Sequence, residues 1–425
     1  MRSVSNGPDA ARSPSSVPYA RSGGWAVAVA ATLGMSVSYI DRQTLAAIAP
    51  TVRSALAIDH TQFGWLLSAF SMAYLVGAPA AGVVVDRLGA RRGFAVAVVV
   101  WSVVAGAHAL VTSFAMLFAL RVLLGAAEAP SFPAAAQAIR RALPPSRRSA
   151  AYGLLFTGSS VGAMVAAPLA LSIEGSYGFR AAFVGTAVVG LAWIPLWLGI
   201  TRADRIPPEE VATSAVDVTP VRWIDVVRSP PVLRAVVAVV GSAPLLMFVL
   251  NFTPQYLVEH WHLPRLGTRW LLMVAPLMFD VGAVGFGWWA STRERRSGTG
   301  TGTGERKTHV DLFLVAAAMA ALLVFAPLAP SARVAVMIFG VAAAGGGGIY
   351  VLATADMLGR VPLRSTSSAG GMTAAAQSLA HIVASPLVGM AIDRTHGYSS
   401  TLIALGLAVI PTSLAFVLWP SMRKR

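Results

Sequence analysis

Ionisable side chains stand inside several long apolar runs of this sequence. Asp41 and Arg42 are adjacent in the first run, Arg121 and Glu128 share a later one, and Asp280 stands alone further on. A charged group at the centre of a lipid bilayer costs about 3 kcal/mol, so it needs a partner, water or a ligand. Carboxylates exchange protons, and a guanidinium binds a carboxylate through two parallel hydrogen bonds. These residue types are therefore suited to binding an organic anion and to moving protons.

The spacing of these groups places them on common helix faces. Tyr39 precedes Arg42 by three residues, and Arg121 precedes Glu128 by two helical turns, so each pair shares a face. Asp41 is the direct neighbour of Arg42 and points elsewhere around the helix. Structural salt bridges that hold helices together are the alternative interpretation of the same charges.

Uncharged polar side chains in later apolar runs extend the set of candidates. Asn251, Gln255 and Gln377 are suited to hydrogen bonds with substrate hydroxyls, and Pro254 should bend its helix. Asp280 is the strongest charged candidate of the second half. A simple hydrogen bond from Asp280 to a neighbouring helix is the alternative.

The elements that carry these residues must be membrane-spanning helices. Of the 425 residues, 56% are apolar and only 12% are charged, about half the charged share of a soluble globular protein. The mean hydropathy is +0.67. A transmembrane helix needs about 20 apolar residues. Such segments follow one another along the chain at 25–50, 61–84, 94–111, 113–138, 150–172, 180–200, 231–257, 267–291, 309–329, 332–358, 366–391 and 399–420. The sequence predicts an all-α membrane protein with twelve transmembrane helices.

A polar segment at 201–230 divides the predicted helices into two halves of six. We expect a disordered cytoplasmic tail at 1–24, six-helix halves at 25–200 and 231–420, and a basic cytoplasmic tail at 421–425. Most of the 33 Lys and Arg residues then fall on the face that carries both termini, as cytoplasmic loops require. The opposite face holds few basic residues, namely Arg53, Arg180, Arg265, Arg269, Arg333 and Arg394.

Several function classes are excluded by composition and motifs. The net charge of +15 does not indicate a nucleic-acid partner, because the basic residues form short clusters without interleaved aromatics. Cysteine is absent, which excludes disulfides and thiolate chemistry. The run Gly345 to Gly348 lacks the Lys and Ser or Thr of a phosphate-binding loop, so it predicts close helix packing or a flexible gate. His108 and His381 are interpreted as core residues. We expect no enzyme activity, no metal and no cofactor.

A motif in the second loop resembles a known family signature. The loop reads Gly82-Val-Val-Val-Asp86-Arg87-Leu88-Gly89-Ala90-Arg91-Arg92. It resembles the signature of the major facilitator superfamily between its second and third helices, and the resemblance extends from about residue 25 to 420. It implies a fold of two related halves. The expected gating residues, which would latch the halves together on the cytoplasmic side, are Gly82, Asp86, Arg87, Gly89, Arg91 and Arg92.

A narrower resemblance rests on two helices. The first carries Tyr39-Ile-Asp41-Arg42, and the fourth carries an Arg and a Glu seven residues apart. These elements resemble the anion:cation symporters of the superfamily, which include bacterial carriers of hexuronates and aldonates. By that resemblance, Arg42 would hold a substrate carboxylate with Tyr39 and Tyr74 beside it.

The same resemblance implies how protons would be coupled. Asp41 and Glu128 would be protonated and released, and Arg121 would balance the charge between them. The hexuronate carriers of this branch have an acid at the place of Asp280, so the resemblance makes Asp280 a further proton-coupling candidate. An anion that occupies an Arg withdraws its support from a nearby carboxylate, so the anion and a proton would load together.

These interpretations predict a monomeric importer of an organic anion in the bacterial inner membrane, driven by proton symport and alternating access. Its partners would be the small anion, the proton and the lipid bilayer, and both termini would be cytoplasmic.

One departure from the resemblance concerns the substrate. The fifth helix reads Gly158-Ser159-Ser160-Val161-Gly162 where an amide is expected, so a smaller carboxylate is an alternative to a sugar acid. A proton-antiport exporter of drugs or metabolites, and a non-transporting receptor or membrane enzyme, are the alternatives of function.

Overall fold

The computed structural model describes residues 23–202, 228–296, 309–361 and 366–419, and these residues contain no β-strand. The first half consists of α1 (Gly24–Ala47), α2 (Ala49–Leu56), α3 (His60–Leu88), α4 (Ala90–Ala107), η1 (His108–Leu110), α5 (Phe114–Glu128), α6 (Ser131–Ala142), α7 (Pro145–Tyr177) and α8 (Phe179–Ile200). The second half consists of α10 (Pro230–Asn251), α11 (Thr253–Gln255), η2 (Tyr256–His260), α12 (Arg265–Thr268), η3 (Leu271–Met273), α13 (Val274–Arg296), α14 (Val310–Ala321), η5 (Leu322–Leu328), α15 (Ala332–Leu358), α16 (Thr366–Thr395) and α17 (Ser399–Leu418).

The predicted all-α fold is confirmed. In the described part of the chain, 10 helical segments are long and apolar enough to cross a membrane. They overlap the third to twelfth predicted spans, and α1 and α3 overlap the first two. The predicted tails and most of the predicted linker fall on residues 1–22, 203–227 and 420–425, which lie outside the described residues.

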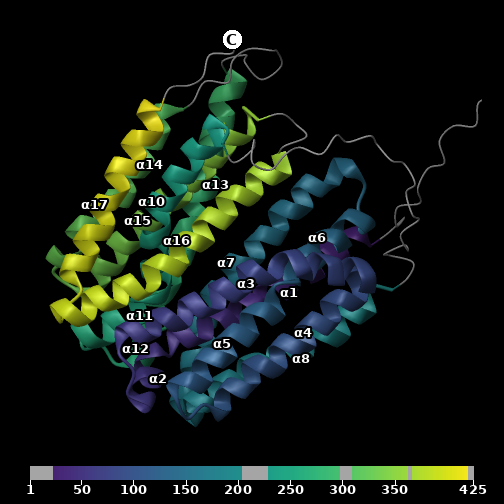
Figure 1. Cartoon of the computed structure of the whole chain (residues 1–425), viewed down its shortest axis with the longest axis horizontal. Coiled ribbons are helices and arrows are strands. Elements are labelled where there is room, and N and C mark those ends of the chain that lie inside the picture. The colour runs from purple at the N-terminus through teal and green to yellow at the C-terminus, as the bar shows by residue number, and fades with distance from the viewer. Residues whose placement is uncertain (1–22, 203–227, 297–308, 362–365, 420–425) are drawn as a thin grey trace, which may run out of the picture.

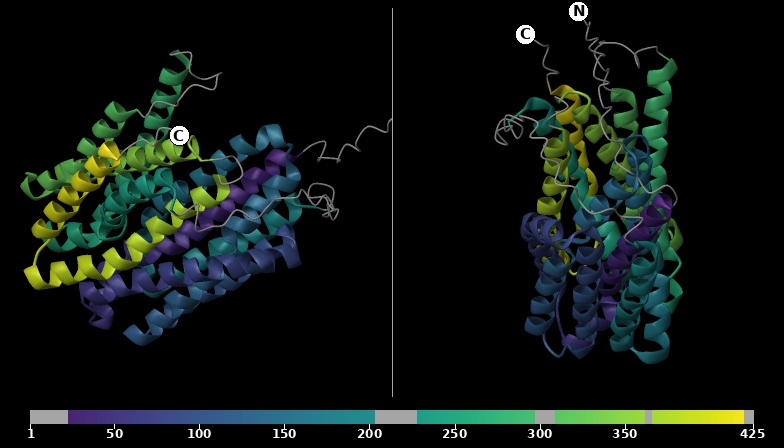
Figure 2. Two further views of the ribbon diagram at one scale, coloured as in Figure 1. Left: turned by 45° about the horizontal axis from the view of Figure 1, so that its top comes forward. Right: turned by 90° about the vertical axis from the view of Figure 1, so that its right-hand side faces the viewer.

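The two halves lie side by side along the length of the molecule. Figure 1 shows the first half in purple and blue and the second in green and yellow, and the views of Figure 2 show the same arrangement. The contacts between the halves include those of α3 with α16, α7 with α13, and α1 with α10. The site residues predicted on α1, α3 and α13 therefore lie on helices that face the other half.

Breaks in two spans position polar residues. Glu128 is the last residue of α5, and the chain continues into α6 only after Ala129 and Pro130. The regular helix is interrupted near Pro254, where the sequence predicts a bend: α10 ends at Asn251, and a short helix and the π-helix η2 follow. Proline has no backbone N–H and its ring crowds the preceding turn, so regular helix stops near it.

The glycine run of α15 is a packing surface. A Cβ atom added at Gly345 would lie 2.4 Å from the Ala316 carbonyl oxygen of α14, and one at Gly347 would lie 2.5 Å from the Phe279 carbonyl oxygen of α13. Only a residue without a side chain permits helices to approach this closely. Of the two predicted roles for this run, close helix packing is therefore confirmed.

The contacts between α3 and α16 lie at the end of the bundle where α3 begins. The distribution of basic residues predicts this end to be external, and it is called the external end below. A Cβ atom at Gly64 would lie 2.3 Å from the Ser385 carbonyl oxygen, and one at Gly389 would lie 2.1 Å from the His60 carbonyl oxygen. Ser68 Oγ also donates a 2.6 Å hydrogen bond to the Ile382 carbonyl. At the opposite end of α16, added Cβ atoms at Gly370 and Gly371 would meet no atom of the described residues within 4 Å.

Candidate functional site

A buried ion pair joins α1 to α5. Arg42 Nε donates a 2.8 Å hydrogen bond to Glu128 Oε2, and Ser38 Oγ donates to the same oxygen at 2.6 Å. Glu128 is 0% exposed, whereas the Arg42 side chain keeps 16% of its surface accessible. The second carboxylate oxygen, Oε1, has no hydrogen-bond partner in the described structure. Glu128, which is predicted to take up a proton, is thus paired with Arg42, which is predicted to bind the substrate.

Aromatic rings surround the Arg42 guanidinium. Its central carbon lies 4.7 Å from the ring centre of Tyr39, 4.8 Å from that of Phe70 and 4.6 Å from that of Tyr74. These distances are within the range of cation–π attraction, which fixes the orientation of the guanidinium. The terminal Nη2 atom is buried without a hydrogen-bond partner among the described residues. The predicted neighbours Tyr39 and Tyr74 are therefore beside Arg42, and a donor remains for an anionic ligand.

Arg121 occupies a deeper position on α5. It is 3% exposed, its Nε donates a 3.4 Å hydrogen bond to the Leu66 carbonyl, and its guanidinium lies 4.7 Å from the Phe70 ring centre. The charges of Arg42 and Glu128 act on it, but among the described residues Glu128 forms its ion pair with Arg42 instead. Phe70 thus separates two cations, a role that its position one turn before Tyr74 could have indicated.

Asp41 points away from Arg42, as its place in the helix predicts. The residue is 4% exposed, and it interacts with Trp101 of α4 and Thr186 of α8 inside the first half. Neither of its carboxyl oxygens has a formed hydrogen bond in the described structure. The two acids predicted to carry protons therefore lie in different surroundings.

The candidates of the second half are dispersed. Asp280 of α13 accepts a 2.6 Å hydrogen bond from Ser160 Oγ of α7, and this bond joins the two halves. Asn251 donates at 2.9 Å to the Met247 carbonyl of its own helix. Gln377 is partly buried on α16. Tyr350 of α15, which was not predicted, lies near Thr373 of α16 and, across the interface between the halves, near Tyr39.

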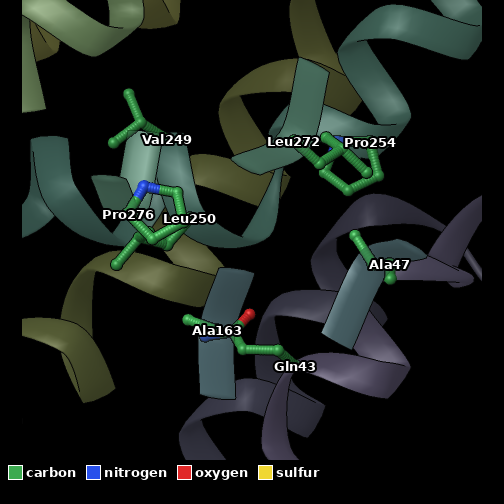
Figure 3. Close-up of a pocket in the computed structure, with 9 residues that line it drawn as sticks. Gln43, Ala47, Ala163, Val249, Leu250, Pro254, Leu272 and Pro276 are labelled. Atoms are coloured by element: carbon green, nitrogen blue, oxygen red, sulfur yellow. The ribbon is translucent and has the colours of Figure 1, made fainter. Parts of the chain in front are cut away.

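A small cavity lies between the halves on the external side of Arg42 along α1 (Figure 3). Its wall is mainly apolar, with the Gln43 amide as the polar side chain among its lining residues. The lining comes from both halves and comprises Gln43, Ala47, Ala163, Ala167, Val249, Leu250, Pro254, Leu272 and Pro276.

A cluster of charged and polar side chains closes the external end. Arg53 Nη1 lies 2.5 Å from Glu259 Oε1, and His60 lies 2.8 Å from Glu259 Oε2 and 2.7 Å from Asp393 Oδ1. Tyr398 Oη donates to Glu259 at 2.6 Å. Arg53 and His60 belong to the first half and the other residues to the second. This external cluster was not predicted, because each member stands alone near a helix end and only the fold brings them together.

Gln255, predicted to bind substrate, belongs to this external cluster in the present conformation. It is 0% exposed, and its Oε1 accepts a 3.1 Å hydrogen bond from Arg53 Nη1. Burial raises the pKa of Glu259, but hydrogen bonds from His60 and Tyr398 and the charge of Arg53 outweigh this effect and lower the pKa below its usual value. Glu259 is therefore held in its ionised form at the join between the halves.

The loop motif makes its contacts within the first half. Asp86 Oδ1 accepts a 2.7 Å hydrogen bond from Gln137 Nε2 of α6, and Arg91 Nη2 donates to the Leu198 carbonyl of α8 at 3.1 Å. Gly89 has φ = 76°, a value that suits glycine, at the junction of α3 and α4. Gly82 lies on α3, Arg87 in its last turn and Arg92 in the first turn of α4.

The sequence pattern of the Major Facilitator Superfamily matches residues 31–385. The chain belongs to this superfamily. It is a multi-pass membrane transporter and not an enzyme.

The chain is similar to several sugar-acid transporters. It is 26% identical over 391 residues to a hexuronate transporter of Bacillus subtilis, covering 90% of this chain and 91% of that protein. It is 37% identical over 181 residues to the hexuronate transporter of Escherichia coli K12, covering 43% of this chain and 42% of that protein. A D-galactonate transporter of Escherichia coli O6:H1 is 23% identical over 404 residues, covering 90% and 92%.

Solved structures share the fold. An inward-facing bacterial homologue of the human lysosomal transporter Spinster superposes with a TM-score of 0.73 at 17% identity, covering 94% of this chain and 95% of that one. This likeness confirms the predicted membrane fold of twelve helices in two halves.

Proposed function

We propose that this protein is a proton-coupled importer of a sugar acid, such as a hexuronate or an aldonate. The observation that carries the proposal is the Arg42 guanidinium, which is paired with Glu128 through Nε and keeps Nη2 without a partner inside an aromatic cage. A guanidinium with one edge occupied and another buried donor available is suited to a carboxylate ligand. The similarity to hexuronate and galactonate transporters supports a sugar acid as that ligand.

Competition for one guanidinium couples the anion to the proton. A substrate carboxylate on Arg42 brings a second negative charge to the group that already neutralises Glu128. A proton on Glu128 removes the competing charge, so the anion and the proton bind better together than either does alone. Arg121 maintains a positive field at this depth, and Asp41 provides a second proton site, so the observed titration belongs to the whole group.

Groups of the second half would complete the substrate site. In this proposal Asn251, Gln377 and Tyr350 supply hydrogen bonds to the substrate hydroxyls, and Asp280, which accepts a hydrogen bond from Ser160 of the other half, is a further proton site. Gln255 would join them when the external cluster opens. The mainly apolar lining beyond Arg42 would contact the carbon faces of a sugar acid once the halves separate.

Alternating access supplies the cycle. The external cluster and the Gly64 and Gly389 contacts close the external end, whereas Gly370 and Gly371 meet open space at the other end, which supports an inward-facing state. We propose that residues 25–200 and 231–420 rock against each other around the linker 201–230. The loop motif from Gly82 to Arg92 would latch them on the cytoplasmic side in the opposite state. The setting would be the bacterial inner membrane, with both termini cytoplasmic and one chain as the working unit.

Uptake into proteoliposomes tests the proposal. Labelled D-glucuronate, D-galactonate and small carboxylates would be offered under an imposed inward proton gradient. We expect accumulation of a sugar acid that is abolished by a protonophore and by Arg42→Ala, with the exposed Arg333→Ala as the matched control. Uptake that is unchanged by the protonophore and by Arg42→Ala would refute the proposal. Resistance to drugs in a sensitive host, without sugar-acid uptake, would favour a proton-antiport exporter instead.

A further inference from the structure

Asp41 faces α4 and α8 within the first half, and Glu128 is the other ionisable group whose charge acts on it. Consecutive residues of an α-helix are about 100° apart around its axis, so Asp41 and Arg42 cannot face the same neighbours. Arg42 faces Tyr39, Phe70 and Tyr74, whereas Asp41 interacts with Trp101 of α4 and Thr186 of α8. The body of α1 therefore stands between the substrate side and the Asp41 side.

The groups around Asp41 have complementary unmet hydrogen-bonding capacity. Trp101 is 0% exposed and its Nε1–H has no hydrogen-bond partner, and both Asp41 oxygens are also without one in the described structure. Thr186 is 1% exposed, and its hydroxyl donates a long 3.3 Å hydrogen bond to the Phe183 carbonyl. Buried polar groups are almost always paired, so unpaired donors beside an unpaired acid indicate a site that works in another state.

We propose that Trp101 and Thr186 are positioning residues that hold Asp41 in both its ionised and its protonated forms. This inference rests on the proposed function, because it takes Asp41 to be a proton site of the transporter. The ionised carboxylate accepts hydrogen bonds from Trp101 Nε1–H and from the Thr186 hydroxyl, which turns away from Phe183. The protonated acid donates its O–H to Thr186 Oγ1, while Thr186 donates to the Phe183 carbonyl and Trp101 donates to the acid's carbonyl oxygen.

Rotation of one hydroxyl thus serves both protonation states without moving a helix. Thr186 can act as donor or acceptor, whereas an indole N–H only donates. Trp101 is fixed by its neighbours, with its ring centre 6.2 Å from that of Phe94. The pair therefore fits a carboxyl group that gains and loses a proton repeatedly, and it would be poorly suited to a permanent ion pair.

Substitutions that remove one hydrogen-bonding group at a time test this inference. Trp101→Phe and Thr186→Val remove the donors while keeping most of the volume, and Thr186→Ser restores the hydroxyl. Trp193→Phe is the matched control, because its indole donates at 2.9 Å to the Ala30 carbonyl of α1 instead of to an acid. Each variant would be measured for the pH profile of proton-driven D-glucuronate uptake and for D-glucuronate exchange at constant pH.

We expect Trp101→Phe and Thr186→Val to move the midpoint of the uptake profile to higher pH by roughly half to one unit, the equivalent of one lost hydrogen bond. The ionised acid loses more from a missing donor than the protonated acid does. Exchange should persist, and Thr186→Ser and Trp193→Phe should behave as the unmodified protein. An unchanged midpoint in both variants, or an equal change in Trp193→Phe, would overturn the inference while leaving symport intact.

An infrared measurement separates this inference from the proposed function. A pH-difference spectrum of the purified protein should contain a carboxylic C=O band that is absent in Asp41→Asn. That band should change frequency and midpoint in Thr186→Val and recover in Thr186→Ser, whatever the substrate is. If the unmodified protein shows no proton-driven uptake but the band behaves as expected, proton symport is refuted and the positioning role of Thr186 stands. A band indifferent to Thr186→Val would refute the positioning role of Thr186.

Discussion

The substitution Glu128→Gln separates anion binding from proton coupling. In the structure Glu128 Oε2 accepts hydrogen bonds from Arg42 Nε at 2.8 Å and from Ser38 Oγ at 2.6 Å. A hydrogen bond between charged partners contributes about 1.5–3 kcal/mol, and a neutral one about 0.5–1.5 kcal/mol. The neutral amide introduced by Glu128→Gln would therefore hold Arg42 less tightly by about 1–2 kcal/mol. That difference becomes available to a substrate carboxylate.

This difference has a measurable consequence. Because 1.4 kcal/mol is a factor of ten in an equilibrium constant, the Kd for the sugar acid should fall by about 5- to 30-fold in Glu128→Gln. The Kd should also depend less on pH, since the competing charge is gone. Proton-driven accumulation should disappear while exchange of internal for external substrate continues.

Titration calorimetry in detergent at several pH values, combined with proteoliposome uptake, checks this prediction. Asp311→Asn is the control, because Asp311 is an exposed acid paired with Arg293. If Glu128→Gln weakens binding, or if it retains the full pH dependence of the Kd, Glu128 is not the competitor of the substrate for Arg42.

Three further outcomes are expected. In this cysteine-free chain, Glu259→Gln should increase external maleimide labelling of Ala163→Cys several-fold. The lowered pKa of Glu259 keeps this residue ionised in mildly acidic medium. The external end of the unmodified protein should therefore lose its closure only as the pH falls through that lowered pKa. Gly64→Ala should disfavour closure by about 1–3 kcal/mol through overpacking and increase the same labelling. Arg42→Ala should destabilise the protein by about 3–5 kcal/mol by stranding buried Glu128, and adding Glu128→Gln should restore thermal stability without restoring uptake.

The fold was predictable because lipid constrains it strongly. Only helices satisfy their own backbone hydrogen bonds in a bilayer, so long apolar runs define the elements with little ambiguity. Charges inside those runs are costly, and this made Asp41, Arg42, Arg121 and Glu128 visible as candidates. The opposite directions of Asp41 and Arg42 followed from helix geometry alone.

The partners of these residues were not predictable from spacing. Arg121 and Glu128 share a helix face, yet the hydrogen-bonded partner of Glu128 is Arg42 of another helix. Helix rotation and depth decide this pairing, and neither is encoded in the distance along one helix. Gln255 was expected near the substrate, but the break after Asn251 carries it to Arg53 of the external cluster.

The external cluster was missed for a different reason. Arg53 and Glu259 are ordinary polar residues at the ends of apolar runs, where charges are common. Their significance arises from contact between residues about 200 positions apart. The same holds for Trp101, whose role depends on the direction of Asp41 across the first half.

The position of α1 links the external cluster to the binding site. This helix carries Arg42, it contacts α10 of the other half, and it continues directly into α2, which carries Arg53. A shift of α1 on release of Glu128 would therefore reach Arg53 across the single residue Ile48 that separates α1 from α2.

Thermodynamic reciprocity makes this link testable. If substrate binding changes the equilibrium constant between the open and closed states of the external end by some factor, loss of closure must change the substrate Kd by a corresponding factor. Substrate should therefore alter the labelling of Ala163→Cys, and Glu259→Gln should alter the Kd in the matching direction. A sugar acid that changes labelling while its Kd is identical with and without Glu259→Gln would show that closure through Arg53 and binding at Arg42 are independent.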